Sequence, residues 1–223
     1  MADQVPFSDT DLMTNTESRC PCVLVLDISG SMQGQPIAEL NEGLIQFKDE
    51  LMSDSLSVKR VEIAIVTFGE AVAVAQEFTS PDSFTTPTLR ASGPTPMGEA
   101  ITKGLELLQE RKDKYRASGI SMYRPWVFLI TDGGPTDQWK PAAELVRVGE
   151  DGKKFSFFGV GVEGANFEIL KQICKREPLR LKGTRFRDLF VWLSRSLKSV
   201  SSSKVGEEVP LTNPKSPDGW ATV

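Results

Sequence analysis

One stretch of the chain, from Cys22 to Ser31, reads CVLVLDISGS. Its apolar half is typical of a buried strand in a parallel sheet, and the strand ends where Asp27 interrupts the run. The loop that follows offers oxygens from Asp27, Ser29 and Ser31 at alternating positions, with Gly30 allowing a sharp turn. Such oxygens are the ligands that a hard divalent cation such as Mg²⁺ prefers. The alternative is a plain turn whose Asp and Ser side chains cap the next helix.

Two later stretches also place oxygen-bearing side chains in loops next to predicted strands or helices. A second apolar run, PWVFLI, begins at Pro125 and ends in TDGGP, which places Asp132 directly after a predicted strand. The segment GPTPMG leads into a helical pattern and contains Thr95. Thr95 is a candidate ligand, but a threonine before Pro96 is also typical of a helix N-cap, and the two roles are compatible. Asp137 is predicted to cap the helix that follows it.

Strand and helix patterns alternate along the chain, which predicts an α/β, Rossmann-like, doubly wound sheet with helices on both faces. We expect six strands, mostly parallel. The hairpin turn at Gly69-Glu70 makes the third strand an antiparallel edge. The expected strands cover residues 20–27, 60–68, 71–78, 125–130, 155–161 and 178–181. Residues 53–59 are expected to form a polar connector.

The domain organisation follows from composition. Residues 1–19 are predicted to form a polar N-terminal arm, 20–200 the folded domain, and 201–223 a C-terminal tail. Trp220 is unusual in such a tail. An aromatic residue there indicates that the tail docks, either on this domain or on a partner.

In an open α/β sheet, ligands bind outside the carboxyl ends of the strands. The loops containing Asp27, Thr95 and Asp132 should all lie at that edge. Two carboxylates brought together repel each other, and a bound cation is the simplest way to neutralise them. The sequence therefore predicts a divalent-cation site there.

The pattern Asp27-x-Ser29-x-Ser31, Thr95 in GPTPMG and Asp132 in TDGG resembles the metal-ion-dependent adhesion site of von Willebrand factor A domains. The resemblance covers roughly residues 20–200, and all five positions of the motif are present. It implies Mg²⁺ (or Mn²⁺) held directly by the three hydroxyl residues, with the two aspartates often acting through water. It also implies a Rossmann-like fold with one antiparallel edge strand.

Within that family the chain is similar to small bacterial TerY-like proteins of tellurite-resistance and stress gene clusters. The similarity rests on features that are less specific than the five metal-site positions, namely TFGEAV, GPTPMGEAI, TDGGPTDQW and the late FRDLFVWLSRS helix. This resemblance implies a phosphatase and a kinase-like protein as associated proteins, and hence a signalling scaffold.

Charge and composition limit the kinds of partner and the cellular location that we expect for this chain. The 223 residues carry a net charge of −4, and with an isoelectric point of about 5.1 the overall charge gives no reason to expect a nucleic-acid partner. Residues 171–204 hold ten Lys or Arg against two acidic residues. That run is typical of a solvated helix face, with an acidic protein or nucleic acid as the alternative. No apolar run spans a bilayer and the N-terminus lacks signal-peptide features, so we expect a cytoplasmic protein without membrane contact.

The absence of histidine and the presence of only three cysteines exclude a four-ligand Cys/His zinc site and a Ser-His-Asp triad. We expect reduced thiols at Cys20, Cys22 and Cys174.

Two functions from different classes stay open at this point. The first is a binding module, not an enzyme, in which an acidic side chain of a protein partner completes the coordination of the metal. The alternative is a Mg²⁺-dependent phosphohydrolase with Asp27 as nucleophile. Phosphatases of the haloacid dehalogenase type carry a second aspartate two residues later, whereas this chain has Ser29.

Overall fold

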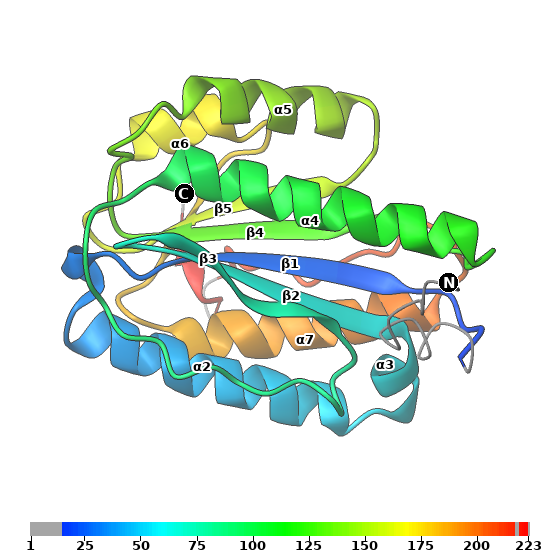
Figure 1. Cartoon of the computed structure of the whole chain (residues 1–223). Helices are drawn as coiled ribbons and strands as arrows, with labels where there is room; N and C mark the ends of the chain where they lie inside the picture. The colour runs from blue at the N-terminus through cyan, green and yellow to red at the C-terminus, as the bar shows by residue number, and fades with distance from the viewer. Residues whose placement is uncertain (1–14, 217–218, 223) are drawn as a thin grey trace, which may run out of the picture.

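The computed structural model describes residues 15–216 and 219–222. They form a seven-stranded sheet with the strand order β3-β2-β1-β4-β5-β6-β7 and with helices on both faces (Figure 1). The inner strands are parallel, and the pairs β2–β3 and β6–β7 at the two edges are antiparallel. The strands are β1 (Cys20–Asp27), β2 (Val61–Phe68), β3 (Val72–Thr79), β4 (Trp126–Thr131), β5 (Ser156–Gly161), β6 (Leu179–Leu181) and β7 (Ala221–Thr222).

The central strand β1 is buried along its whole length because it pairs with β2 on one side and β4 on the other. Its side chains alternate between two apolar cores. Leu24 and Leu26 face one core, and Val23 and Val25 face the other. This two-sided burial explains why the strand is continuously apolar rather than alternating.

Each core is closed by a layer of helices (Figure 1). One layer contains α2 (Gln35–Met52), the short α3 (Ser55–Arg60) and α7 (Phe186–Ser202), and the other contains α4 (Met97–Ala117), α5 (Lys140–Asp151) and α6 (Phe167–Ile173). Gly43 permits close contact between α2 and α7, since a Cβ there would lie 2.6 Å from the Phe190 ring. Gly104 does the same for α4 against Val25.

The structure confirms the predicted fold class, including the antiparallel β2–β3 edge. It corrects two details. The sheet has seven strands among the described residues rather than six, because Ala221 and Thr222 add β7 at the far edge. The expected polar connector contains α3, which begins where the Asp54 carboxylate accepts a hydrogen bond from the Ser57 amide at 2.8 Å.

The tail predicted to dock does so on this domain. Trp220 is only 3% exposed, and its ring lies 5.6 Å from that of Trp192 on α7. The three cysteines are free and buried, and burial raises the pKa of the Cys20 and Cys174 thiols to about 12.

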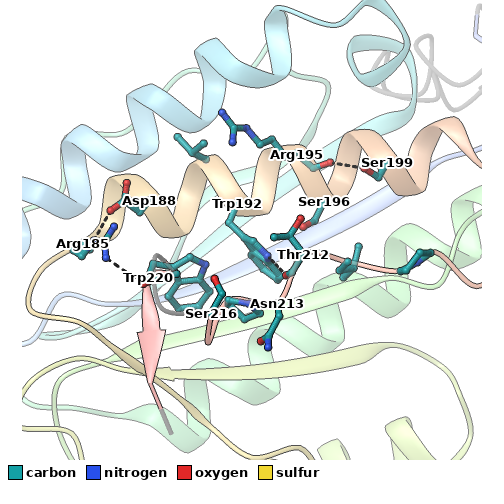
Figure 2. Close-up of a pocket in the computed structure, with 15 residues that line it drawn as sticks. Arg185, Asp188, Trp192, Arg195, Ser196, Ser199, Thr212, Asn213, Ser216 and Trp220 are labelled. Atoms are coloured by element: carbon teal, nitrogen blue, oxygen red, sulfur yellow. Dashed lines mark hydrogen bonds and ion pairs between the residues drawn. The ribbon is translucent and has the colours of Figure 1, made fainter.

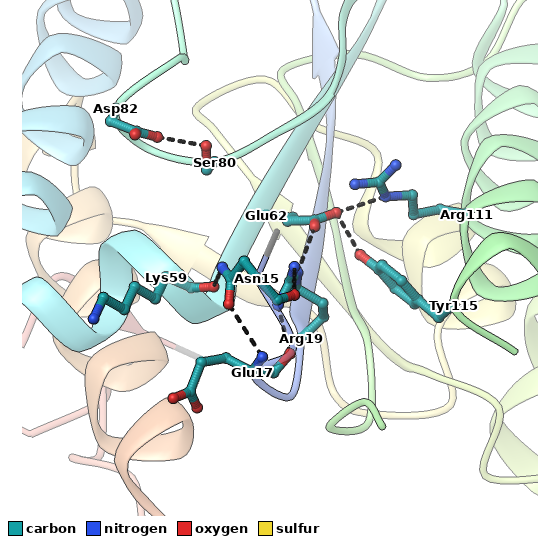
Figure 3. Close-up of polar contacts among 9 residues, drawn as sticks. All are labelled: Asn15, Glu17, Arg19, Lys59, Glu62, Ser80, Asp82, Arg111 and Tyr115. Atoms are coloured by element: carbon teal, nitrogen blue, oxygen red, sulfur yellow. Dashed lines mark hydrogen bonds and ion pairs between the residues drawn. The ribbon is translucent and has the colours of Figure 1, made fainter. Parts of the chain in front are cut away.

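Of the predicted N-terminal arm, residues 1–14 lie outside the described part, whereas residues 15–19 pack against the domain (Figure 3). Arg19 is buried and donates from Nε to Glu62 at 2.9 Å. Glu62 also accepts hydrogen bonds from Arg111 at 2.6 Å and from the Tyr115 hydroxyl at 2.5 Å. This buried network joins the start of β1 to β2 and α4. It lies at the amino ends of these two strands, whereas the predicted site lies at their carboxyl ends.

We predict that Glu62→Ala lowers the free energy of unfolding by about 3 kcal/mol or more, because it leaves buried guanidinium groups without their carboxylate. Urea denaturation measures the change. The matched control is Glu77→Ala on the exposed face of β3, which should alter stability little. Equal losses in the two variants would contradict a structural role for the network.

Candidate metal centre

The three predicted loops meet at the carboxyl edge of the sheet and are joined through their backbones. The amide of Gly30, in the loop after β1, donates to Gly93 O at 3.0 Å, and the Ser92 amide donates to Ile28 O at 2.7 Å. The Thr136 amide, in the loop after β4, donates to Thr95 O at 2.9 Å. These bonds link each loop to the next and so fix the position of the side chains that they carry.

Four of the five predicted residues form a connected set of hydrogen bonds. Asp27 is fully buried and accepts at Oδ1 from the Ser29 amide at 2.8 Å. The hydroxyls of Ser29 and Ser31 lie 3.1 Å apart, and Ser31 donates to Asp132 Oδ1 at 2.7 Å. Ser31 is exposed, so the set opens to solvent at this side chain.

Thr95 lies beside the same set. A Cβ built on Gly133 would be 3.6 Å from Thr95 Oγ1 and 4.0 Å from Ser31 Oγ, so both hydroxyls face the space in front of that glycine. All five predicted residues are therefore brought together at one edge of the sheet.

The structure speaks against one of the two roles considered for Thr95, that of a helix N-cap. The N-cap position of α4 is Pro96, and no side chain of that position caps the helix. The Asp137 carboxylate instead accepts from the amides of Gly98 at 3.0 Å and Glu99 at 2.8 Å. The expectation that Asp137 caps its own following helix is wrong, because its loop folds back onto the first turn of α4. The Thr95 hydroxyl is thus not used as the cap.

Thr131 is a site residue that the sequence reasoning missed. Its hydroxyl donates to Asp27 Oδ2 at 2.5 Å and accepts from the Gly133 amide at 3.2 Å. Strand register explains the contact, since Leu26 pairs with Ile130 and the next residues of the two strands therefore lie opposite each other. A signal existed in the sequence, because Thr131 is the last residue before Asp132.

The electrostatics of the edge suit a bound cation. Burial raises the pKa of Asp27, and the nearby Asp132 charge raises it further, while hydrogen bonds from Ser29 and Thr131 oppose the shift. Burial also raises the pKa of Asp132, against the hydrogen bond from Ser31. Two carboxylates are thus held close together at a cost that a positive ion would relieve.

The donor set fits Mg²⁺ or Mn²⁺. It consists of two carboxylates and three hydroxyls, with no nitrogen or sulfur, which is the chemistry that hard divalent cations prefer. Within residues 15–216 and 219–222, no three Cys, Asp or Glu side chains are grouped so that they could hold a metal ion by themselves. A site at this edge would therefore depend on the hydroxyls of Ser29, Ser31 and Thr95.

Asp27 is poorly placed to act as a nucleophile. Both of its oxygens accept hydrogen bonds from within the chain, and the side chain has no exposed surface. An attacking carboxylate must reach the substrate. The geometry therefore argues against the phosphohydrolase alternative and suits Asp27 to orienting Ser29 and the ligands around it.

A sequence profile of the von Willebrand factor type A domain matches residues 22–188. The chain belongs to this family. Comparison with curated proteins by sequence finds no significant match.

Solved structures share the fold of this von Willebrand factor type A domain at low sequence identity. The pilus adhesin SpaC of Lactobacillus rhamnosus GG has a TM-score of 0.64 and 13% identity, over 84% of this chain and 31% of that chain. Proximal thread matrix protein 1 of the mussel byssus has a TM-score of 0.57 and 15% identity, over 82% and 49%. Manganese-loaded TRAP protein of Plasmodium vivax has a TM-score of 0.53 and 19% identity, over 78% and 74%.

The chain thus spans less than half of the adhesin and of the matrix protein. None of the three structures is named as an enzyme. The helices within the described part of this domain include none with the length and apolar character to cross a membrane.

We predict that Asp27→Asn stabilises the metal-free domain at pH 7. The raised pKa means that the folded chain holds the Asp27 proton more tightly than the unfolded chain does, so the carboxylate costs stability at neutral pH. This cost disappears as the pH falls through the raised pKa. The stability difference between variant and wild type should therefore shrink on acidification.

Thermal unfolding in EDTA between pH 4 and 7.5 measures this difference. A variant less stable than the wild type at pH 7 would mean that the hydrogen bonds to the carboxylate outweigh its burial cost, and that Asp27 is a structural residue.

Proposed function

We propose that this von Willebrand factor type A domain is a metal-dependent protein-interaction module, which binds an acidic side chain of a partner through Mg²⁺ or Mn²⁺. The observation that carries the proposal is the convergence of two carboxylates and three hydroxyls at the carboxyl edge of the sheet. Three direct hydroxyl ligands leave coordination positions open, and a carboxylate of the partner would fill one of them. The manganese-loaded TRAP structure, which shares the fold, supports the choice of ion.

Each residue has a distinct task in this proposal. Ser29, Ser31 and Thr95 would hold the ion directly, with Asp27 and Asp132 acting from behind through water. The bond from Thr131 keeps Asp27 oriented, and the backbone bonds between loops hold Thr95 opposite the two serines. The ion supplies the positive charge that attracts the partner's carboxylate, and the protein supplies a preformed set of oxygens around it.

The basic run at residues 171–204 gives little reason to propose a nucleic-acid partner. Five of its cations pair with carboxylates of this chain, namely Lys171, Lys175, Arg176, Arg185 and Lys198. Such pairing is typical of a solvated protein surface and leaves fewer charges for phosphate contacts. A protein is therefore the partner that we propose.

The resemblance of GPTPMGEAI, TDGGPTDQW and the α7 sequence to TerY-like proteins supports a more specific setting. We place the module in the bacterial cytoplasm, in a stress or tellurite-resistance system. Its partners there would include the associated phosphatase and kinase-like proteins.

We predict that immobilised wild-type domain retains partner proteins in Mg²⁺ and releases them in EDTA, because the ion forms the bridge. Thr95→Val removes one ligand oxygen without changing the shape of the side chain and should abolish that retention. Ser199→Ala removes a hydroxyl from α7 and should retain the same proteins as the wild type. Mass spectrometry of the eluates measures the outcome. Retention that persists in EDTA or in Thr95→Val would contradict the proposal.

A further inference from the structure

Residues 204–216 and 219–222 follow α7 and form what we call the C-terminal strap (Figure 2). The strap is fixed to the domain at two places. Trp192 Nε1 on α7 donates to Thr212 O at 2.7 Å, and the last part of the strap pairs with β6 as β7. The strap therefore forms a wall of the folded domain.

A pocket of about 350 Å³ lies between the strap and α7, and we call it the strap pocket (Figure 2). Its lining includes Trp192 and Ser196 from α7 and Trp220 from the strap. It includes none of the five predicted metal-site residues. A cavity of roughly 150 Å³ is enough to hold benzene. The strap pocket thus has room for a molecule with one or two rings.

The indole of Trp220 brings an unsatisfied hydrogen-bond donor to this pocket. Trp220 is only 3% exposed, and its Nε1 group has no hydrogen-bond partner within the described residues. The neighbouring indole of Trp192 differs, because its Nε1 group is bonded to Thr212 O. Buried N–H groups are almost always paired, since an unpaired one destabilises the fold. The missing acceptor is therefore expected from a molecule in the pocket that Trp220 lines.

A water molecule would satisfy this donor but would not fill the pocket. One water occupies about 30 Å³, which is a small part of the 350 Å³ between the strap and α7. The rest of that volume borders apolar side chains such as Leu211 and the Trp192 ring. A molecule that carries both an acceptor and an apolar body suits this pocket better than water does.

The charge of the lining favours an anion. Arg185 and Asp188 pair with each other at 2.5 Å, so their charges cancel. Arg195 is the other charged residue of the lining and gives it a net positive charge. An ionised acceptor also binds an N–H donor more strongly than a neutral acceptor does.

We propose that the strap pocket is a small-molecule site that binds an aromatic carboxylate. The carboxylate accepts the hydrogen bond of Trp220 Nε1, and the aromatic ring packs against the Trp192 indole. The positive charge of Arg195 favours the anion over a neutral analogue. Because the strap and α7 both line the pocket, the bound molecule joins them and stabilises the folded chain.

The test uses the full chain, with benzoate as a probe that combines one ring and one carboxylate. Nitrogen–proton NMR spectra report each indole N–H group, and the Trp220 signal is the one that Trp220→Phe removes. Benzoate should shift this signal saturably, with a dissociation constant of about 1 mM, which is ordinary for so small a ligand. The Trp192 signal should move less, because that group stays bonded to Thr212 O.

Two comparison probes separate the parts of the proposal. Benzamide has the ring without the charge, and inorganic phosphate has the charge without the ring. Each should bind the wild-type chain at least tenfold more weakly than benzoate does. Arg195→Gln should weaken the binding of benzoate and leave that of benzamide unchanged. Binding should be equal in Mg²⁺ and EDTA, so the outcome does not depend on the metal site.

Trp220→Phe keeps an aromatic ring but lacks the donor, and it should bind benzoate at least tenfold more weakly in calorimetry. The matched control is Trp139→Phe, which changes a tryptophan that packs on the opposite face of the sheet and should bind benzoate as the wild type does.

Absence of a saturable shift of the Trp220 signal in the folded wild-type chain would overturn the proposal and leave water as the acceptor. Equal binding of benzoate by Trp220→Phe and by the wild type would overturn it as well. Equal binding of benzoate and benzamide by the wild type would overturn the preference for an anion. The comparison of probes uses the wild-type chain and so does not depend on the folding of any variant.

Discussion

The arrangement of side chains at the candidate metal centre depends on a buried carboxylate at the end of the central strand. Asp27 follows a strand with both faces buried, and parallel register places it opposite Thr131 on β4. The carboxylate is held there by two hydrogen bonds although burial disfavours its charge. The fold thus keeps a charged group where an apolar one would cost less. A bound cation would offset that cost, and this supports the proposal of a metal centre at this edge.

The sequence predicts the parts of this fold in which one strong pattern dominates. The continuous apolar runs before Asp27 and Asp132 mark β1 and β4, because only strands buried on both faces lack polar positions. Once these are placed, the topology of an α/β sheet brings the two loops to one edge. The five candidate ligands could be named for this reason.

Other features depend on contacts that no local pattern encodes. The strand β7 has two residues, and its pairing with β6 depends on the packing of Trp220 against Trp192 of α7. Asp137 caps α4 rather than α5, which follows from how two loops meet and not from its own neighbours. Gly43 looks like a weak point of α2 by helix propensity. A glycine is needed there because the Phe190 ring of α7, which is distant in sequence, leaves no room for a Cβ.

The central claim is that Ser29, Ser31 and Thr95 hold a divalent ion in front of Gly133. Anomalous diffraction from crystals grown with Mn²⁺ tests it most directly. The account predicts one anomalous peak at about 2.1 Å from each of the three hydroxyl oxygens, the distance expected for direct coordination of a small divalent cation, and no such peak in Asp27→Ala crystals. A wild-type structure in Mn²⁺ with no peak there, and with the bond from Ser31 to Asp132 intact, would contradict it.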